Sequence, residues 1–147
     1  MTIGSGVNGI MENILPTLQS GLPVLLGQFA VTLVLLGVGI VVYMWVTPFN
    51  EFRLIREGSP AAGIMVLGTL IALSLPLAAT LASSLVVLDI VVWGLVALVI
   101  QLAAFVLASR LVGDMRRMIE AGNVAAALVV VGIQLAVAIL NAGAMAG

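Results

Sequence analysis

The chain has 147 residues, of which 63% are apolar and 7% are charged, and its formal net charge is −1. A typical soluble domain is about 45–50% apolar and about 25% charged, so the composition excludes a water-soluble globule. The five basic residues are all arginines, too few to bind nucleic acid by counterion release. Without Cys or His, disulfides, thiolate metal sites and histidine catalysis are excluded, and we expect no catalytic site, metal site or cofactor.

Residues 1–23 form an N-terminal stretch before the first long apolar run. The stretch does not resemble a signal peptide, because it lacks a positively charged start and because Glu12 interrupts its apolar residues. Pro16 and Pro23 punctuate it. We therefore expect a loose or interface-lying extracytoplasmic segment, with a short surface helix over residues 10–18 as one form of it.

Four long gaps between charged residues follow, and each is long enough for the roughly 20 apolar residues that cross a bilayer as a helix. Outer-membrane barrels show short alternating strands instead of such continuous runs. The fold class is therefore an all-α integral membrane protein with four transmembrane helices. These helices are expected at residues 24–46, 61–82, 86–109 and 124–142.

The arginines decide the expected orientation of these spans. Arg53 and Arg56 lie in the connection 47–60, and Arg110, Arg116 and Arg117 lie in the connection 110–123. Arginine is retained on the cytoplasmic side of membranes. We therefore expect both connections in the cytoplasm, and both termini and the short connection after residue 82 outside it.

The two connections also match each other at an offset of 64 residues. Asn50 aligns with Asp114 and Gly58 with Gly122, and these pairs suit the N-cap and the left-handed end of a short helix. An internal match at a fixed offset indicates a duplicated unit. We expect two hairpin repeats, 24–82 and 83–147, parallel because each contains two spans, and each with a short amphipathic cytoplasmic helix.

Several short motifs resemble a known family and occur in its order. They are Thr47-Pro48-Phe49-Asn50-Glu51, Leu54-Ile55-Arg56-Glu57-Gly58, Ser74-Leu75-Pro76-Leu77-Ala78, Trp93-Gly94, Gln101-Leu102 and Ile119-Glu120-Ala121-Gly122-Asn123. The chain thus resembles the YjfL-type membrane proteins, domain of unknown function family 350. The resemblance implies a multi-pass protein of the bacterial inner membrane with four spans in two repeats. It also implies an association with envelope-stress components, without an established activity.

Polar residues within the spans allow two interpretations. Asp89 is either an interfacial group at a helix N-terminus or an intramembrane proton or cation site. Glutamines either hold helices together or line a polar seam, and Pro76 either kinks a helix for packing or opens its backbone to an ion. The residues of this polar seam or ion path are Gln28, Ser74, Pro76, Asp89, Gln101, Gln134 and Asn141.

The charged residues of the connections also allow two interpretations, because they are either anchored to anionic headgroups or form a docking surface for a cytoplasmic partner. The expected docking residues are Glu51, Arg53, Arg56, Glu57, Arg110, Arg116, Arg117 and Glu120. Pairing between the arginines of one connection and the carboxylates of the other is a further expectation.

Two functions of different classes remain open. The first is a non-enzymatic structural component that self-associates and docks a soluble cytoplasmic partner through its Arg/Glu connections. The alternative is a small oligomeric channel or carrier that uses the region of Pro76 and Asn141. An enzyme is not expected, because general acid–base catalysis needs positioned titratable groups and here they lie only in connections or at an interface. The expected partners are the lipid bilayer, further copies of the chain and a soluble protein, but no nucleic acid.

Overall fold

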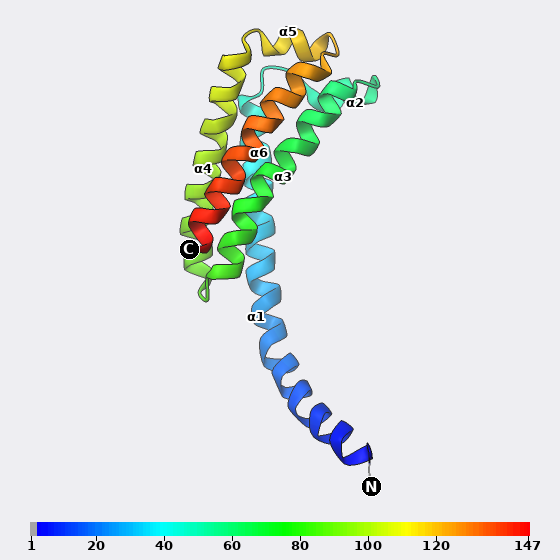
Figure 1. Ribbon diagram of the computed structural model, residues 1–147, viewed down its shortest axis with the longest axis vertical. Coiled ribbons are helices and arrows are strands. Elements are labelled where there is room, and N and C mark those ends of the chain that lie inside the picture. Colours follow the sequence, from blue (N-terminus) through cyan, green and yellow to red (C-terminus); the bar gives the residue numbers. More distant parts are fainter. Residues whose placement is uncertain (1–2) are drawn as a thin grey trace.

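The computed structural model describes the backbone of residues 3–147 and the side chains of residues 14–147. This described part consists of helices joined by short connections, without a strand (Figure 1). The helices are α1 (Ile3–Val46), α2 (Glu51–Arg56), α3 (Pro60–Ser83), α4 (Val87–Val112), α5 (Met115–Glu120) and α6 (Val124–Ala146). Four of them, α1, α3, α4 and α6, are long and apolar enough to cross a membrane, which confirms the all-helical class and the four predicted spans.

The four long helices form one bundle, in which α3 and α6 make the most extensive contact. Helix α4 packs against both of them, and α1 packs against α3 and α4. The short helices α2 and α5 lie at the same end of this bundle (Figure 1). We call this end, which carries all five arginines, the arginine end; the short connection between α3 and α4 marks the opposite end.

The local signals that predicted the two short helices are confirmed. The side chain of Asn50 accepts a hydrogen bond from the main-chain N–H of Arg53 at 2.9 Å, and Asp114 caps α5 in the same way. After each helix a glycine adopts the left-handed conformation, with φ of 85° at Gly58 and 77° at Gly122. That conformation strains any residue with a Cβ atom, so glycine ends each short helix where the sequence predicted.

Helix α1 differs from the sequence expectation, which placed a loose or interfacial segment before residue 24. The helix instead begins at Ile3 and continues through Pro16 and Pro23. Proline removes one helix hydrogen bond, but its fixed φ is itself helical, so each proline interrupts the hydrogen bonding of α1 and does not end the helix. At about 1.5 Å per residue, α1 is about 66 Å long, roughly twice the thickness of a bilayer core.

Much of α1 projects beyond the bundle (Figure 1). The side-chain amide of Gln28 donates to the main-chain carbonyl of Leu85 at 3.2 Å, which places Gln28 level with the opposite end. Ser20, Val24 and Leu25 still line a pocket with Leu81 of α3, so α1 leaves the bundle only before Ser20. The described side chains of residues 14–27 are exposed.

The core of the bundle has two parts. At the arginine end, Tyr43, Met65 and Phe105 belong to a cluster that joins all six helices, and the rings of Tyr43 and Phe105 meet edge to face with centroids 4.8 Å apart. Toward the opposite end, Leu35, Leu77 and Leu98 belong to a second cluster, formed by α1, α3 and α4. The apolar packing therefore extends along the bundle on both sides of its middle.

Candidate functional site

The exposed charges of the described residues are concentrated at the arginine end. Arg53 of α2 pairs with its C-cap residue Glu57 at 3.7 Å, and Arg116 pairs with Glu120 within α5 at 3.1 Å. The ion pairs found among the described side chains thus each lie within one connection, and the expected pairing between the two connections is not among them. Exposed pairs of this kind stabilise a helix by only about 0.3–0.5 kcal/mol, so these side chains are available to other groups.

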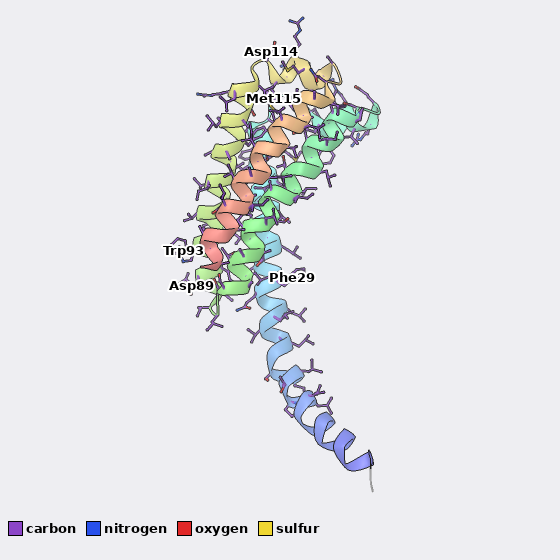
Figure 2. All side chains as sticks on the ribbon, in the orientation of Figure 1. Phe29, Asp89, Trp93, Asp114 and Met115 are labelled. Atoms are coloured by element: carbon purple, nitrogen blue, oxygen red, sulfur yellow. The ribbon has the colours of Figure 1, made fainter. Side chains whose placement is uncertain are left out.

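Arg56, Arg110 and Arg117 are also exposed. The seven exposed docking residues of the sequence analysis therefore share one end of the molecule. They are Arg53, Arg56, Glu57, Arg110, Arg116, Arg117 and Glu120. The exposed N-cap Asp114 lies among them (Figure 2). We call this surface the charged end surface. It carries five exposed arginines and three exposed carboxylates, so its net charge is positive.

Glu51 does not belong to the charged end surface. It is the first residue of α2, and it is only 2% exposed. Burial raises the pKa of its carboxyl above the usual value, because an ionised carboxylate loses its hydration when it is buried. Glu51 was predicted from the sequence to be one of the docking residues, but its side chain points into the bundle and not toward the charged end surface.

The Glu51 carboxylate lies beside the hydroxyl of Tyr43, which comes from α1 and is itself near the hydroxyls of Thr47 and Thr69. Neither the Tyr43 hydroxyl nor Oε1 of Glu51 makes a hydrogen bond of ordinary geometry in the structure. A pocket of about 190 Å³ adjoins these groups, and its other lining residues are mainly apolar. The site therefore combines buried polar groups with an apolar surrounding.

A second group of polar side chains lies deeper in the bundle. The hydroxyl of Thr69 in α3 donates to Oε1 of Gln134 in α6 at 3.2 Å. Nε2 of Gln101 in α4 donates to the main-chain carbonyl of Gln134 at 2.7 Å. All three side chains are buried. Gln134 is ten residues into α6, or about 15 Å at 1.5 Å per residue, so this group joins three helices at mid-depth.

The other residues of the predicted polar seam lie apart from one another and do not contact the buried group of Thr69, Gln101 and Gln134. Gln28 lies at the opposite end, and the amide of Asn141 donates to the carbonyl of Ala97 at 3.3 Å. The Ser74 hydroxyl donates to the carbonyl of Ile71 in its own helix at 3.0 Å, and Pro76 is buried against its neighbours. These bonds give the side chains of Gln28, Ser74 and Asn141 structural partners.

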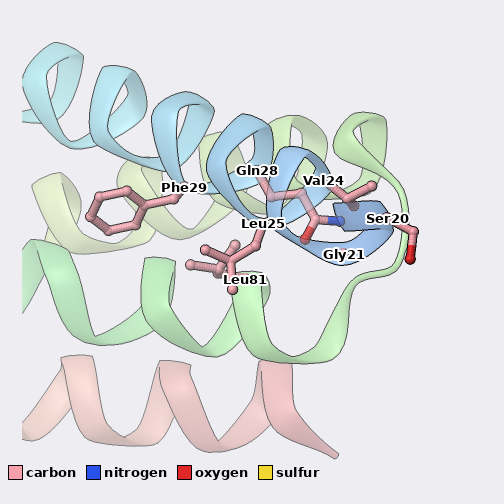
Figure 3. Close-up of a pocket in the computed structure, with 7 residues that line it drawn as sticks. All are labelled: Ser20, Gly21, Val24, Leu25, Gln28, Phe29 and Leu81. Atoms are coloured by element: carbon pink, nitrogen blue, oxygen red, sulfur yellow. The ribbon is translucent and has the colours of Figure 1, made fainter. Parts of the chain in front are cut away.

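Asp89 lies in the first turn of α4, exposed and near Trp93 (Figure 2). It lines a pocket of about 600 Å³ at the opposite end. This position matches the interfacial interpretation of Asp89 at a helix N-terminus. A second pocket at that end, of about 560 Å³, lies between α1 and α3 and is lined by Gln28, Phe29 and Leu81 among others (Figure 3). Among the described residues, no cluster of acidic side chains could hold a metal ion.

Tyr43, Thr47 and Thr69 were not predicted as site residues from the sequence. Thr69 carried a usable signal, because it follows Ala62 by seven residues and Met65 by four on one face of α3, and all three are buried. A polar residue on an apolar helical face is the sign of an internal contact. Tyr43 carried a weaker signal as the single tyrosine of the chain.

The sequence comparisons agree with this membrane architecture. Two curated relatives, each named "UPF0719 inner membrane protein YjfL", come from Escherichia coli strain K12 and Escherichia coli O157:H7. Each is 38% identical over 64 residues, a match that covers 44% of this chain and 48% of the relative. The chain therefore spans about half the length of the curated relatives it matches. No solved structure matches it.

The family described as Domain of Unknown Function (DUF350) matches residues 17–145. This match covers all four helices that are able to span a membrane. Together with the inner-membrane relatives, it supports a multi-pass protein in the inner membrane. On this evidence the chain belongs to the DUF350 family of membrane proteins, whose function is unknown.

Proposed function

We propose that this protein is a non-enzymatic, self-associating component of the bacterial inner membrane that docks a soluble cytoplasmic partner through its charged end surface. In this proposal the arginine end faces the cytoplasm, as the distribution of arginines favours, and both termini lie on the other side. The chain consists of two parallel hairpin units. The matched caps and glycines of α2 and α5 support that duplication.

The projecting part of α1 carries the proposal of self-association. Apolar side chains of α1 near and beyond the end of the bundle, such as Leu15, Leu18 and Leu22, are at least half exposed. Exposed apolar surface of this extent indicates a contact with another molecule. A second copy of α1 offers the same apolar residues at the same height, and a symmetric contact between copies is the commonest arrangement of oligomers.

The test replaces Leu15 and Leu22, which lie seven residues apart on one helical face, by alanine. The protein in lipid nanodiscs is then examined by native mass spectrometry. We expect wild-type oligomers and a shift of the double variant toward the monomer. The control variant Val99→Ala with Leu140→Ala truncates two exposed side chains of α4 and α6 and should remain oligomeric. A monomeric wild-type protein would contradict self-association.

The charged end surface supports the proposal of a soluble partner. Because the charged end surface carries five exposed arginines and three exposed carboxylates, a partner surface that complements it is acidic. Rim charges of this kind mainly raise association rates and select partners. The exposed arginines come from both short helices and from the end of α4, so a partner that contacts all of them must cover the whole end of the bundle.

A photo-crosslinking amino acid at residue 56 in α2 or at residue 120 in α5 tests this docking in cells. We expect the same soluble protein to be captured from both positions, and capture to fall when Arg116→Glu and Arg117→Glu are introduced together. Residue 85, at the opposite end, is the matched control position. Capture of lipid alone at residues 56 and 120 would leave headgroup anchoring as the role of these arginines and would overturn the docking proposal.

The alternative of a channel or carrier is favoured by one observation, the buried polar group at mid-depth formed by Thr69, Gln101 and Gln134. The region of Pro76 and Asn141, where the sequence predicted the path of a channel or carrier, is less favourable for one, because both residues are buried in packing contacts. Ion flux through proteoliposomes tests the alternative. Flux that disappears in the Gln101→Leu variant would favour it, and vesicles that stay tight with the wild-type protein would contradict it.

A further inference from the structure

Glu51 occupies a position at which the equivalent short helix of the chain has an apolar residue. It is the first residue of α2, and Met115, 64 residues further on, is the first residue of α5. Both side chains are buried, with exposed fractions of 2% and 3%. Each follows an N-cap residue that makes the same hydrogen bond. Packing at this position is thus satisfied by methionine in one short helix, so a need for core packing does not explain the carboxylate.

No cation neutralises the Glu51 carboxylate within the part of the chain that the structure describes. The titratable group beside it is Tyr43 of α1, and the hydroxyl of Thr47 also lies near it. Helix α3 contributes Thr69, which lies beside Tyr43. Helices α3 and α6 contain no charged residue. The other charges near this end are exposed: Arg53 and Arg56 of α2, the C-cap Glu57, Arg110 of α4, the N-cap Asp114, and Arg116, Arg117 and Glu120 of α5.

A buried carboxylate without a cation is removed from water at a cost of several kcal/mol, and proteins avoid that cost by neutralising the group with a proton. Three ligands are conceivable for a lone carboxylate: a metal ion, an organic amine and a proton. A hard metal ion takes six or more oxygen ligands, which this site does not offer. An amine needs access to the carboxylate, but Oε1 of Glu51 is shielded from the pocket beside it.

We propose that Glu51 is a proton-binding site, and that a buried polar chain of Tyr43, Thr69, Gln134 and Gln101 connects it to the middle of the bundle. Two links of this chain are hydrogen bonds, from Thr69 to Gln134 at 3.2 Å and from Gln101 to the Gln134 carbonyl at 2.7 Å. The link from Glu51 to Thr69 passes through the Tyr43 hydroxyl, which lies beside both. The proposal goes beyond docking and self-association and depends on neither.

Because each hydroxyl donates in one direction, protonation of Glu51 changes the hydrogen bonding along the polar chain. The Thr69 hydroxyl donates toward Gln134, so its oxygen is free to accept from Tyr43. When Glu51 carries a proton, its O–H donates to Tyr43, and Tyr43 in turn donates to Thr69. When Glu51 is ionised, the Tyr43 hydroxyl donates to the carboxylate instead, and Thr69 loses that donor. Binding of one proton at the arginine end therefore changes the hydrogen bonding of a residue that joins α3 to α6.

Infrared difference spectroscopy of the full chain in lipid tests the site, because a protonated carboxyl and an ionised carboxylate absorb at separate frequencies. We expect a protonated-carboxyl band that persists at a pH at which exposed carboxylates are all ionised. The band should be absent in Glu51→Gln and retained in Glu57→Gln, which alters an exposed acid of the same helix. Absence of the band from the wild type, or its retention in Glu51→Gln, would overturn the proposal.

A second variant keeps the test decisive if Glu51→Gln folds poorly. Tyr43→Phe removes one hydroxyl and leaves the ring against Phe105. Because that hydroxyl donates to the ionised carboxylate and so favours it, we expect the Glu51 band to titrate at a higher pH in Tyr43→Phe than in the wild type. An unchanged titration would show that Tyr43 does not contact the proton site and would contradict the polar chain.

Discussion

At the scale of single residues, the buried polar side chains differ in whether they bond across helices or within one. Thr69 donates to Gln134 of another helix, whereas the equally buried Thr80 donates to the carbonyl of Leu77 in its own helix. Hydrogen bonds between membrane helices contribute about 0.6 kcal/mol on average. The same residue type thus has two roles in α3, and substitution can separate them.

Replacing Thr69 by the nearly isosteric valine should destabilise the bundle by about 1 kcal/mol, because Oε1 of the buried Gln134 is left without its donor. The matched substitution Thr80→Val should have a smaller effect, since the Leu77 carbonyl also belongs to the hydrogen bonding of helix α3. Unfolding of both variants in detergent micelles measures the difference. Equal losses of stability would show that the bond between Thr69 and Gln134 contributes nothing of its own.

The raised pKa of Glu51 also predicts how stability depends on pH. The folded state holds this proton to a higher pH than the unfolded state does, so the contribution is fully present below the unfolded pKa. It is lost as the pH rises through the folded pKa. We expect Glu51→Gln to flatten this fall in stability and Glu57→Gln to leave it unchanged, as measured by thermal unfolding at a series of pH values. A fall that persists in Glu51→Gln would assign it to other groups.

At the scale of elements, the closest packing in the bundle depends on one glycine of α3. A Cβ atom built on Gly68 would overlap the side chain of Val131 in α6. Gly132 of α6, its counterpart 64 residues further on, has no such neighbour within 4 Å. The two glycines therefore share a position in the duplicated pattern but not a role in packing.

Gly68→Ala should destabilise the protein by about 1–3 kcal/mol, because α3 and α6 must move apart to admit the methyl group. Gly132→Ala should not destabilise the protein, and it should be neutral or stabilising by up to about 1 kcal/mol, because the position is open and alanine favours a helix over glycine. Chemical unfolding of the two variants in the same detergent compares them. Similar stabilities of the two would contradict the close approach of α3 and α6 at Gly68.

Local signals predicted elements well, whereas side-chain partners depended on packing. The caps Asn50 and Asp114 and the ends at Gly58 and Gly122 follow from short-range rules, and the structure has them. The inward direction of Glu51 could not be predicted, because it depends on how α2 packs against α3. The contact between Thr69 and Gln134 likewise requires the register of two helices that are distant in the sequence.

At the scale of the whole molecule, the sequence predicted four apolar spans but not the full length of α1. The prolines Pro16 and Pro23 indicated breaks, yet the helix continues through both. The reason is that a lone helix still satisfies most of its backbone groups internally, even with single hydrogen bonds missing. The arrangement that results is a bundle from which one helix projects at one end (Figure 1). The projecting helix is apolar, and the exposed arginines lie at the other end.

The central claim of this account is that the arginine end faces the cytoplasm and the connection between α3 and α4 faces outward. The chain has no cysteine, so single cysteines can report the side directly, at the exposed Arg56 and Arg116 and at Leu85, which is 92% exposed. A membrane-impermeant thiol reagent should label Arg56→Cys and Arg116→Cys only in inverted vesicles and Leu85→Cys only in intact spheroplasts. Labelling of residues 56 and 116 from opposite sides of the membrane, or of all three positions from one side, would contradict the account.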